Sequence, residues 1–177
     1  MKIIIGADHR GVELKKKVMA ILDDKKIDYE DTGVSTTKSV DYPDIAIPLA
    51  ERVAKGEFER GILICNTGIG MCIAANKVKG AYVALCLSSN MAEYARRHNN
   101  ANIMALSGEH INDDDLERML TLFIETEFEG KRHQKRFDKI AEKENEWVSK
   151  EDVLKLQKEL KKWEKEARHW QSRAWRR

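Results

Sequence analysis

The segment Gly61-Ile-Leu-Ile-Cys-Asn-Thr-Gly-Ile-Gly70 decides the fold, because a short apolar run leads directly into a glycine-rich turn. Residues 61–64 are too few and too uniformly apolar for an amphipathic helix, so they predict a central strand of a parallel sheet. Residues 71–78 predict a helix, which places the turn 67–70 at its N-terminus. Backbone N–H groups at a helix N-terminus attract anions, so this turn suits a phosphate or a developing oxyanion.

Cys65 stands at the edge of this turn. Open α/β sheets bind ligands at the carboxyl ends of their strands, and a helix N-terminus favours the thiolate form of a nearby cysteine. Both facts make Cys65 a candidate base or nucleophile. The same pattern also fits a tight turn that binds nothing and a cysteine that only fills the core, as we expect for Cys72 and Cys86.

Apolar runs and helical patterns alternate on both sides of this segment. Further strands are predicted at 2–6, 27–29, 82–86 and 102–106, and helices at 12–24, from 43 onward, 89–97, 113–127 and 131–145. Regular alternation with short connections predicts an α/β fold. We expect a three-layer α/β/α sandwich with a mostly parallel, five-stranded, Rossmann-like sheet, followed by a C-terminal helical tail.

The composition changes near the C-terminus, where all four tryptophans lie within the last 31 residues. Ser149 and Asp152 have the spacing of a helix cap. Residues 150–177 hold ten basic and five acidic side chains, a net charge of +5, so the preceding residues carry −3 of the total of +2. We therefore predict two parts, 1–148 and 149–177. A heptad stripe runs along the second part: Val153, Leu156, Leu160, Trp163, Ala167, Trp170 and Ala174.

Several roles fit this tail. It could pack on the body of the protein or on a second copy, form a coiled coil in a larger oligomer, or be a fused or engineered segment. A nucleic-acid contact is disfavoured, because acidic residues interleave with the basic ones.

The bulk composition limits the remaining possibilities. With 177 residues, of which 42% are hydrophobic, the chain can bury one core and carry an appendage. Three cysteines without a CxxC pair or a histidine cluster predict neither a disulfide framework nor a metal site. No apolar run approaches the roughly 18 residues of a membrane span. We expect no signal peptide and a cytoplasmic location.

Other candidate residues lie outside the central segment. Asp8 and His9 follow the first strand and should share the sheet edge of Cys65, although a helix-capping Asp with an exposed His is the simpler interpretation. His98 is an isolated histidine that could move protons. Arg132 and Arg136 are four residues apart, as in a phosphate clamp, although such charge runs usually face solvent.

Together these pieces resemble the type B ribose-5-phosphate isomerases, whose relatives act on galactose 6-phosphate and allose 6-phosphate. The resemblance runs from residue 1 to about 143. Its motifs are Ala7-Asp8-His9, Asp41-Tyr42-Pro43, Cys65-x-Thr67-Gly68-x-Gly70 with Ala74-Ala75-Asn76-Lys77, His98-Asn99 and Glu129-Gly-x-Arg-His133.

The resemblance implies interconversion of D-ribose 5-phosphate and D-ribulose 5-phosphate through an enediolate, without a metal or another cofactor. Cys65 would move the proton between the two sugar carbons, Thr67 would assist it, and His98 would open the furanose ring. The implied substrate-binding residues are Asp8, His9, Asn66, Gly68, Ile69, Gly70, Asn99, Arg132 and Arg136. Of these, the 68–70 backbone would form the anion hole, and the phosphate would bind His9 and both arginines.

The resemblance also concerns partners. In the family the arginines reach the site from the neighbouring subunit, so it implies a homodimer or larger homo-oligomer with its active site at the subunit interface. An isomerase of a six-carbon sugar phosphate, such as allose or galactose 6-phosphate, is an alternative. A non-catalytic assembly protein on the same fold is another.

The chain departs from the family pattern at Asn66, at Arg10 and at Lys79, where proline is usual. Asn66 stands where glycine is usual, and because Asn best replaces Gly in left-handed conformations, we expect that conformation there. Arg10 adds positive charge beside the expected phosphate-binding end of the substrate site. Met71 stands where a related branch has a Glu base, so the thiol branch fits better.

Overall fold

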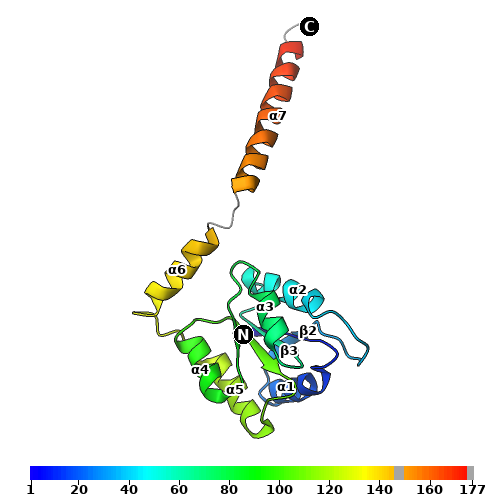
Figure 1. The fold of residues 1–177 in the computed structure, drawn as a ribbon, viewed down its shortest axis with the longest axis vertical. Helices are drawn as coiled ribbons and strands as arrows, with labels where there is room; N and C mark the ends of the chain where they lie inside the picture. Colours follow the sequence, from blue (N-terminus) through cyan, green and yellow to red (C-terminus); the bar gives the residue numbers. More distant parts are fainter. Residues whose placement is uncertain (146–149, 175–177) are drawn as a thin grey trace. The chain divides into compact units, whose positions relative to one another are not determined.

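A computed structural model of the chain describes residues 1–145 and 150–174, with the side chains of 1–145 and 152–167. Five strands form one sheet in the order β2-β1-β3-β5-β4, and every neighbouring pair is parallel (Figure 1). The predicted five-stranded sheet is thereby confirmed. The strands are β1 (Lys2–Ala7), β2 (Asp28–Asp31), β3 (Arg60–Cys65), β4 (Val83–Leu85) and β5 (Ile103–Ser107).

Helices cover both faces of this sheet, as expected for a three-layer sandwich. On one face lie α1 (Val12–Asp24), α4 (Ser89–Arg97) and α5 (Asp113–Glu125), whose buried side chains share one apolar cluster. On the other face lie α2 (Pro43–Ala54) and α3 (Ile69–Ala75), which share a second cluster. The sheet separates the two clusters.

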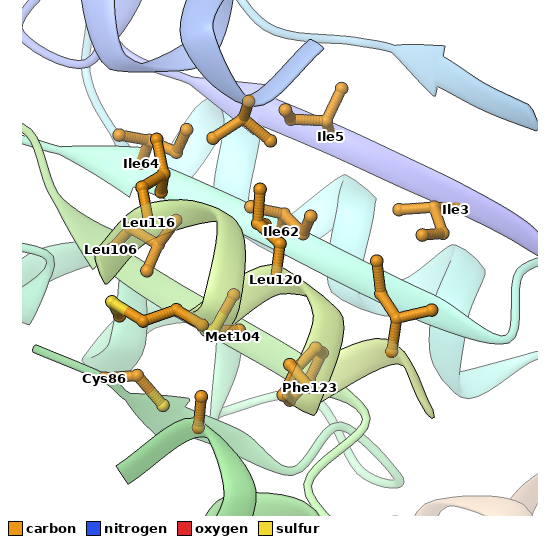
Figure 2. Close-up of a cluster of buried hydrophobic side chains, with 14 of the residues drawn as sticks. Ile3, Ile5, Ile62, Ile64, Cys86, Met104, Leu106, Leu116, Leu120 and Phe123 are labelled. Atoms are coloured by element: carbon orange, nitrogen blue, oxygen red, sulfur yellow. The ribbon is translucent and has the colours of Figure 1, made fainter. Parts of the chain in front are cut away.

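Alternation along the strands divides the core between the two faces. Ile62 and Ile64 of β3 point to the α1/α5 face, where Figure 2 shows Ile62 beside Leu120 and Ile64 beside Leu116 of α5. Leu63 and Cys65 belong to the cluster under α2 and α3. The side chain of Cys65 therefore faces the helix that begins with the glycine turn.

The observed boundaries differ from the predicted ones at a few helix ends. α3 begins at Ile69 rather than 71, so Gly70 lies in its first turn. α6 (Gln134–Asn145) begins later than the predicted 131. Gly130 (φ 64°) and Lys131 (φ 50°) both adopt left-handed conformations, which a right-handed helix cannot include.

The internal contacts divide the chain into two compact units, Met1–Phe137 and Asp138–Arg177. The second unit holds most of α6 and all of α7 (Lys150–Ala174). The predicted boundary between 148 and 149 stays a prediction. The proposed cap Ser149, together with Trp147, Trp175 and the side chain of Trp170, lies outside the described residues. No helix among the described residues has both the length and the hydropathy of a membrane span.

Candidate active site

The carboxyl ends of β1, β3 and β5 meet at one edge of the sheet. Cys65 pairs with Ser107 in register, and the N–H of Asp8 donates to the carbonyl of Ile64 at 3.1 Å. Asp8 and Cys65 therefore end neighbouring strands, as the sequence predicts. We call Asp8, His9 and residues 65–70 the Cys65 cluster.

Cys65 is buried, and its sulfur is held by the turn that follows it. The N–H of Gly68 donates to Cys65 Sγ at 3.1 Å. Gly68 adopts φ 76°, and a Cβ there would lie 2.5 Å from Leu85 Cδ1 and 3.0 Å from the Leu106 carbonyl oxygen. The sulfur of Cys65 therefore has a backbone donor within hydrogen-bond distance. In the resemblance the same amide belongs to the anion hole; in this structure it contacts the sulfur.

The rest of the turn is tightly packed. Thr67 Oγ1 accepts a long hydrogen bond from the Ile69 N–H at 3.4 Å. A Cβ at Gly70 would lie 3.0 Å from the ring of Tyr42, so this ring lies directly over the turn. The turn therefore has a fixed shape and one aromatic wall.

The expectation for Asn66 is wrong. The left-handed residue of the turn is Gly68, and Asn66 has no positive φ. Its side chain instead donates to Glu109 Oε2 at 2.7 Å, and its carbonyl accepts from the Glu109 N–H at 3.1 Å and from Ser107 Oγ at 2.7 Å. Asn66 thus joins the turn to the segment that follows β5.

Asp8 and His9 occupy the turn between β1 and α1. Asp8 Oδ1 accepts from the N–H groups of Arg10 at 2.8 Å and Gly11 at 3.1 Å, so it closes the turn that leads into α1. The predicted capping of the helix by Asp8 is wrong, because the N-cap residue is Gly11 and no side chain caps the helix. His9 Nδ1 accepts from the Val40 N–H at 3.3 Å, which directs the other ring nitrogen away from that loop. His9 is half-buried rather than fully exposed.

His98 lies in a second group, at the C-terminal end of α4. Its ring is stacked between Tyr94, with centroids 4.8 Å apart, and His133, at 4.2 Å and an interplanar angle of 7°. The Glu129 N–H donates to the Arg97 carbonyl at 3.0 Å, which fixes the loop before α6 against α4. We call the following residues the His98 cluster: Tyr94, Arg97, His98, Asn99, Glu129, Arg132, His133 and Arg136.

This cluster combines two imidazoles with guanidinium groups. Arg97 Nε donates to His98 Nε2 at 3.3 Å, and Arg132 Nε donates to His133 Nε2 at 3.2 Å. Burial, followed by the nearby charges of His98 and Arg132, holds the pKa of His133 below its ordinary value. The side chains of Arg132 and Arg136 are exposed, as are those of Asn99 and Glu129.

Metal binding is a possible use of this cluster. The ligand atoms of His98, Glu129 and His133 lie within 4.8 Å of one another. However, the Nε2 atoms of both imidazoles already accept hydrogen bonds from arginines, and positive side chains surround them. The arginine N–H donors and the surrounding positive charge suit an anion better than a cation.

The two clusters lie at opposite ends of the strands, the His98 cluster at the amino ends and the Cys65 cluster at the carboxyl ends. α4 follows β4 and leads into the start of β5, so its C-terminal end lies at the amino edge of the strands. Cys65 lies at the carboxyl edge. β5 has five residues, which at about 3.3 Å each separates the two edges by roughly 16 Å. One chain therefore does not bring His98, Asn99, Arg132 and Arg136 to Cys65.

The other two thiols, Cys72 and Cys86, are poorly suited to act as a base or a nucleophile. Burial raises the pKa of Cys72, whose sulfur contacts the Val83 carbonyl. Burial also raises the pKa of Cys86 to about 12. Both stay protonated near neutral pH. Cys86 belongs to the buried core, as expected, whereas Cys72 is only half-buried.

The structure adds residues that the sequence interpretation left out of the site. Tyr94 lies four residues before His98, a helical spacing that predicts contact. Glu109 follows β5 at the edge that holds Cys65, so the strand-end argument that selected Asp8 would also have found it. His133 was part of a recognised motif but had no assigned role.

Residues 3–140 match the family described as Ribose/Galactose Isomerase. The chain is 46% identical over 146 residues to the putative sugar phosphate isomerase YwlF of Bacillus subtilis. The aligned region covers 81% of this chain and 97% of that protein. It is 42% identical to a probable ribose-5-phosphate isomerase B of Mycoplasma genitalium, over 81% and 96% of the two chains.

Solved structures are also similar. Ribose-5-phosphate isomerase B of Clostridium thermocellum superposes with a TM-score of 0.80 at 43% identity, covering 83% of this chain and 99% of that one. The Mycoplasma genitalium enzyme with bound ribulose 5-phosphate gives a TM-score of 0.78 at 42% identity, over 82% and 97% of the chains. These relatives are matched over nearly their full length, so about a fifth of the present chain lies outside the match.

Proposed function

Because the chain belongs to the ribose/galactose isomerase family, we propose that it interconverts D-ribose 5-phosphate and D-ribulose 5-phosphate. The observation that carries this proposal is Cys65, a strand-end thiol that accepts a backbone N–H at 3.1 Å beside a glycine turn. A relative whose structure holds ribulose 5-phosphate supports the choice of substrate.

The proposed chemistry moves one proton between adjacent carbons. After His98 opens the furanose ring, the Cys65 thiolate removes the proton on C2, and the C1 carbonyl oxygen becomes the oxyanion of an enediolate. The thiol then returns this proton to C1, while the hydroxyl proton passes from O2 to O1 beside Thr67. Backbone N–H groups of Ile69 and Gly70 would face the oxyanion, where such donors typically contribute ~3 to 4 kcal/mol each to the transition state.

The proposed enzyme is a homodimer, because each site needs residues from both clusters. His98, Arg132 and Arg136 lie at the sheet edge opposite Cys65, so a second chain must supply them. In a two-fold dimer each surface contacts its own copy, and one interface can therefore form two sites, each with one Cys65 cluster and one His98 cluster.

An exposed apolar surface supports this arrangement. Its side chains come from α3, from the loop after the edge strand β4 and from α4, so it begins inside the Cys65 cluster with Ile69 and ends inside the His98 cluster with Tyr94. Its exposed side chains are Ile69, Ile73, Leu87, Met91 and Tyr94. Burying such a surface favours association.

The phosphate would bind His9 of one chain and Arg132 and Arg136 of the other. The exposed guanidinium groups suit an anion. Nothing in this proposed reaction requires a metal, so a chelator should leave turnover unchanged.

Turnover assays with a Cys65→Ala variant test the proposal. We expect ribose 5-phosphate turnover in the wild type, unaffected by a chelator, and a loss of about 10²- to 10⁴-fold in the variant. Cys72→Ala is the matched control, since that thiol is protonated and should keep turnover. Near-wild-type activity of Cys65→Ala would show that the base is a different residue. Allose and galactose 6-phosphates are assayed in parallel, and turnover of no sugar phosphate would favour a binding protein.

A further inference from the structure

The α7 helix carries an apolar stripe that is open to solvent. Within its described side chains, apolar residues recur at spacings of three and four. Leu156 is 62% exposed, Leu160 60% and Trp163 70%. A stripe of this kind on a helix normally packs against a partner. The helix also lies beyond residue 140, where the family match ends.

Over residues 152–167, whose side chains the structure describes, the charges are sorted around the stripe. At 100° per residue, four acidic side chains of this stretch lie about 60° to 100° from the centre of the stripe, whereas five lysines lie about 120° to 180° away. The acidic side chains are Asp152, Glu159, Glu164 and Glu166, and the lysines are 155, 158, 161, 162 and 165. The apolar stripe therefore has acidic borders, and the back of the helix is basic.

We propose that this acid-bordered stripe, formed by Val153, Leu156, Leu160, Trp163 and Ala167 with its four acidic neighbours, binds a helix of another protein whose own apolar stripe is bordered by lysine or arginine. The positions beside an apolar seam face their counterparts on the partner helix, and opposite charges there determine which helices pair. Trp163 is the anchor, because large aromatic side chains dominate such interfaces.

A second copy of the same helix fits this stripe poorly. In a parallel pair, Glu159 would face Glu164 of the other copy. In an antiparallel pair, acidic borders again meet each other, because the described border positions hold only acidic side chains and Gln157. Like charges at these positions disfavour association.

A membrane surface fits poorly as well. Helices that lie on anionic lipid place lysine and arginine where their long side chains reach the headgroups beside the apolar face. Here carboxylates occupy those positions, and anionic headgroups would repel them.

Two labelled helical peptides test this proposal with the full chain. Both carry the same apolar stripe, but one has lysine and the other glutamate at the border positions, and fluorescence anisotropy reports binding. We expect the lysine peptide to bind at least about tenfold more tightly, with an affinity that falls between ~50 and ~500 mM salt. A chain that ends at residue 147 should bind neither.

Charge-reversed variants sharpen the test. Replacing Glu159, Glu164 and Glu166 with Lys should reverse the preference toward the glutamate peptide. Replacing Lys158, Lys162 and Lys165 with Glu, which changes only the back of the helix, should leave the preference intact. Equal binding of both peptides by the wild-type chain would overturn the proposal.

Two other results would contradict it in favour of a different occupant. If light scattering shows that the full chain forms a larger oligomer than the chain ending at 147, and Leu160→Asp abolishes the difference, the occupant is a second copy. If the full chain sediments with anionic vesicles and Trp163→Ala prevents this, the occupant is a lipid surface.

Discussion

Asn66 and Glu109 form a polar pair at the edge of the Cys65 cluster. Gly108, which precedes Glu109, packs against the turn after β1, because a Cβ at Gly108 would lie 2.9 Å from the Arg10 carbonyl oxygen. A carboxylate at this end of the site would repel a phosphate if it were free to turn toward it. If the phosphate binds at His9, as proposed, the amide of Asn66 would hold Glu109 away from it.

Asn66→Gly tests this role. Without the amide, Glu109 is free, and we expect KM for ribose 5-phosphate to rise by about threefold with little change in kcat, as suits an exposed charge interaction. Glu109→Gln in the same chain should restore KM, and Glu109→Gln alone should not raise it. A fall in kcat at constant KM would instead indicate that Asn66 acts on Cys65.

His133 makes the stability of the chain depend on pH. Its pKa in the folded chain lies below the ordinary value of about 6.5, so the unfolded chain binds a proton more readily. Stability should therefore fall as the pH is lowered from about 6.5 toward the folded pKa. His133→Phe keeps the stacking but cannot titrate, so the wild type should lose melting temperature relative to this variant as the pH falls. A difference that stays constant with pH would refute the assignment.

At the level of elements, most of the fold could be predicted from the sequence. The helices at 12–24 and 89–97 match the structure because their apolar spacing, and for α4 the cap Ser88, act locally. The start of α6 could not be predicted, because a left-handed Lys131 leaves no signal in its own sequence. The turn at 67–70 was predicted, but its left-handed residue is Gly68, whose conformation depends on contacts with β4 and β5.

Gly68 and Gly56 offer a matched comparison. Both adopt left-handed φ, 76° and 78°, but a Cβ at Gly68 would meet Leu85 and Leu106, whereas nothing lies within 4 Å at Gly56. Gly56→Ala should cost about 1 to 2 kcal/mol of unfolding free energy and leave turnover unchanged. Gly68→Ala should cost more and should also reduce kcat, because it displaces the N–H that contacts Cys65. Denaturant unfolding and turnover assays provide both values. Equal costs with unchanged kcat would mean that the turn tolerates the side chain.

At the level of the whole molecule, the sequence pointed to the residues of the candidate site but not to their distribution. Asp8, Cys65 and Thr67 could be grouped because strand order places them at one edge. The separation of His98 from that edge follows from the direction of α4, which the linear sequence does not express. The described structure thus contains two separate clusters, and it remains our proposal that they are the two halves of one site, joined in a dimer.

Mixing two inactive variants tests the proposed shared site most directly. Cys65→Ala and His98→Asn each remove one half, so either variant alone should have little turnover. When equal amounts are unfolded and refolded together, half of the dimers should be mixed, and each of these holds one intact site. We predict that the mixture regains about a quarter of wild-type ribose 5-phosphate turnover. A mixture no more active than the separate variants would contradict the account, because Cys65 and His98 would then have to act within one chain.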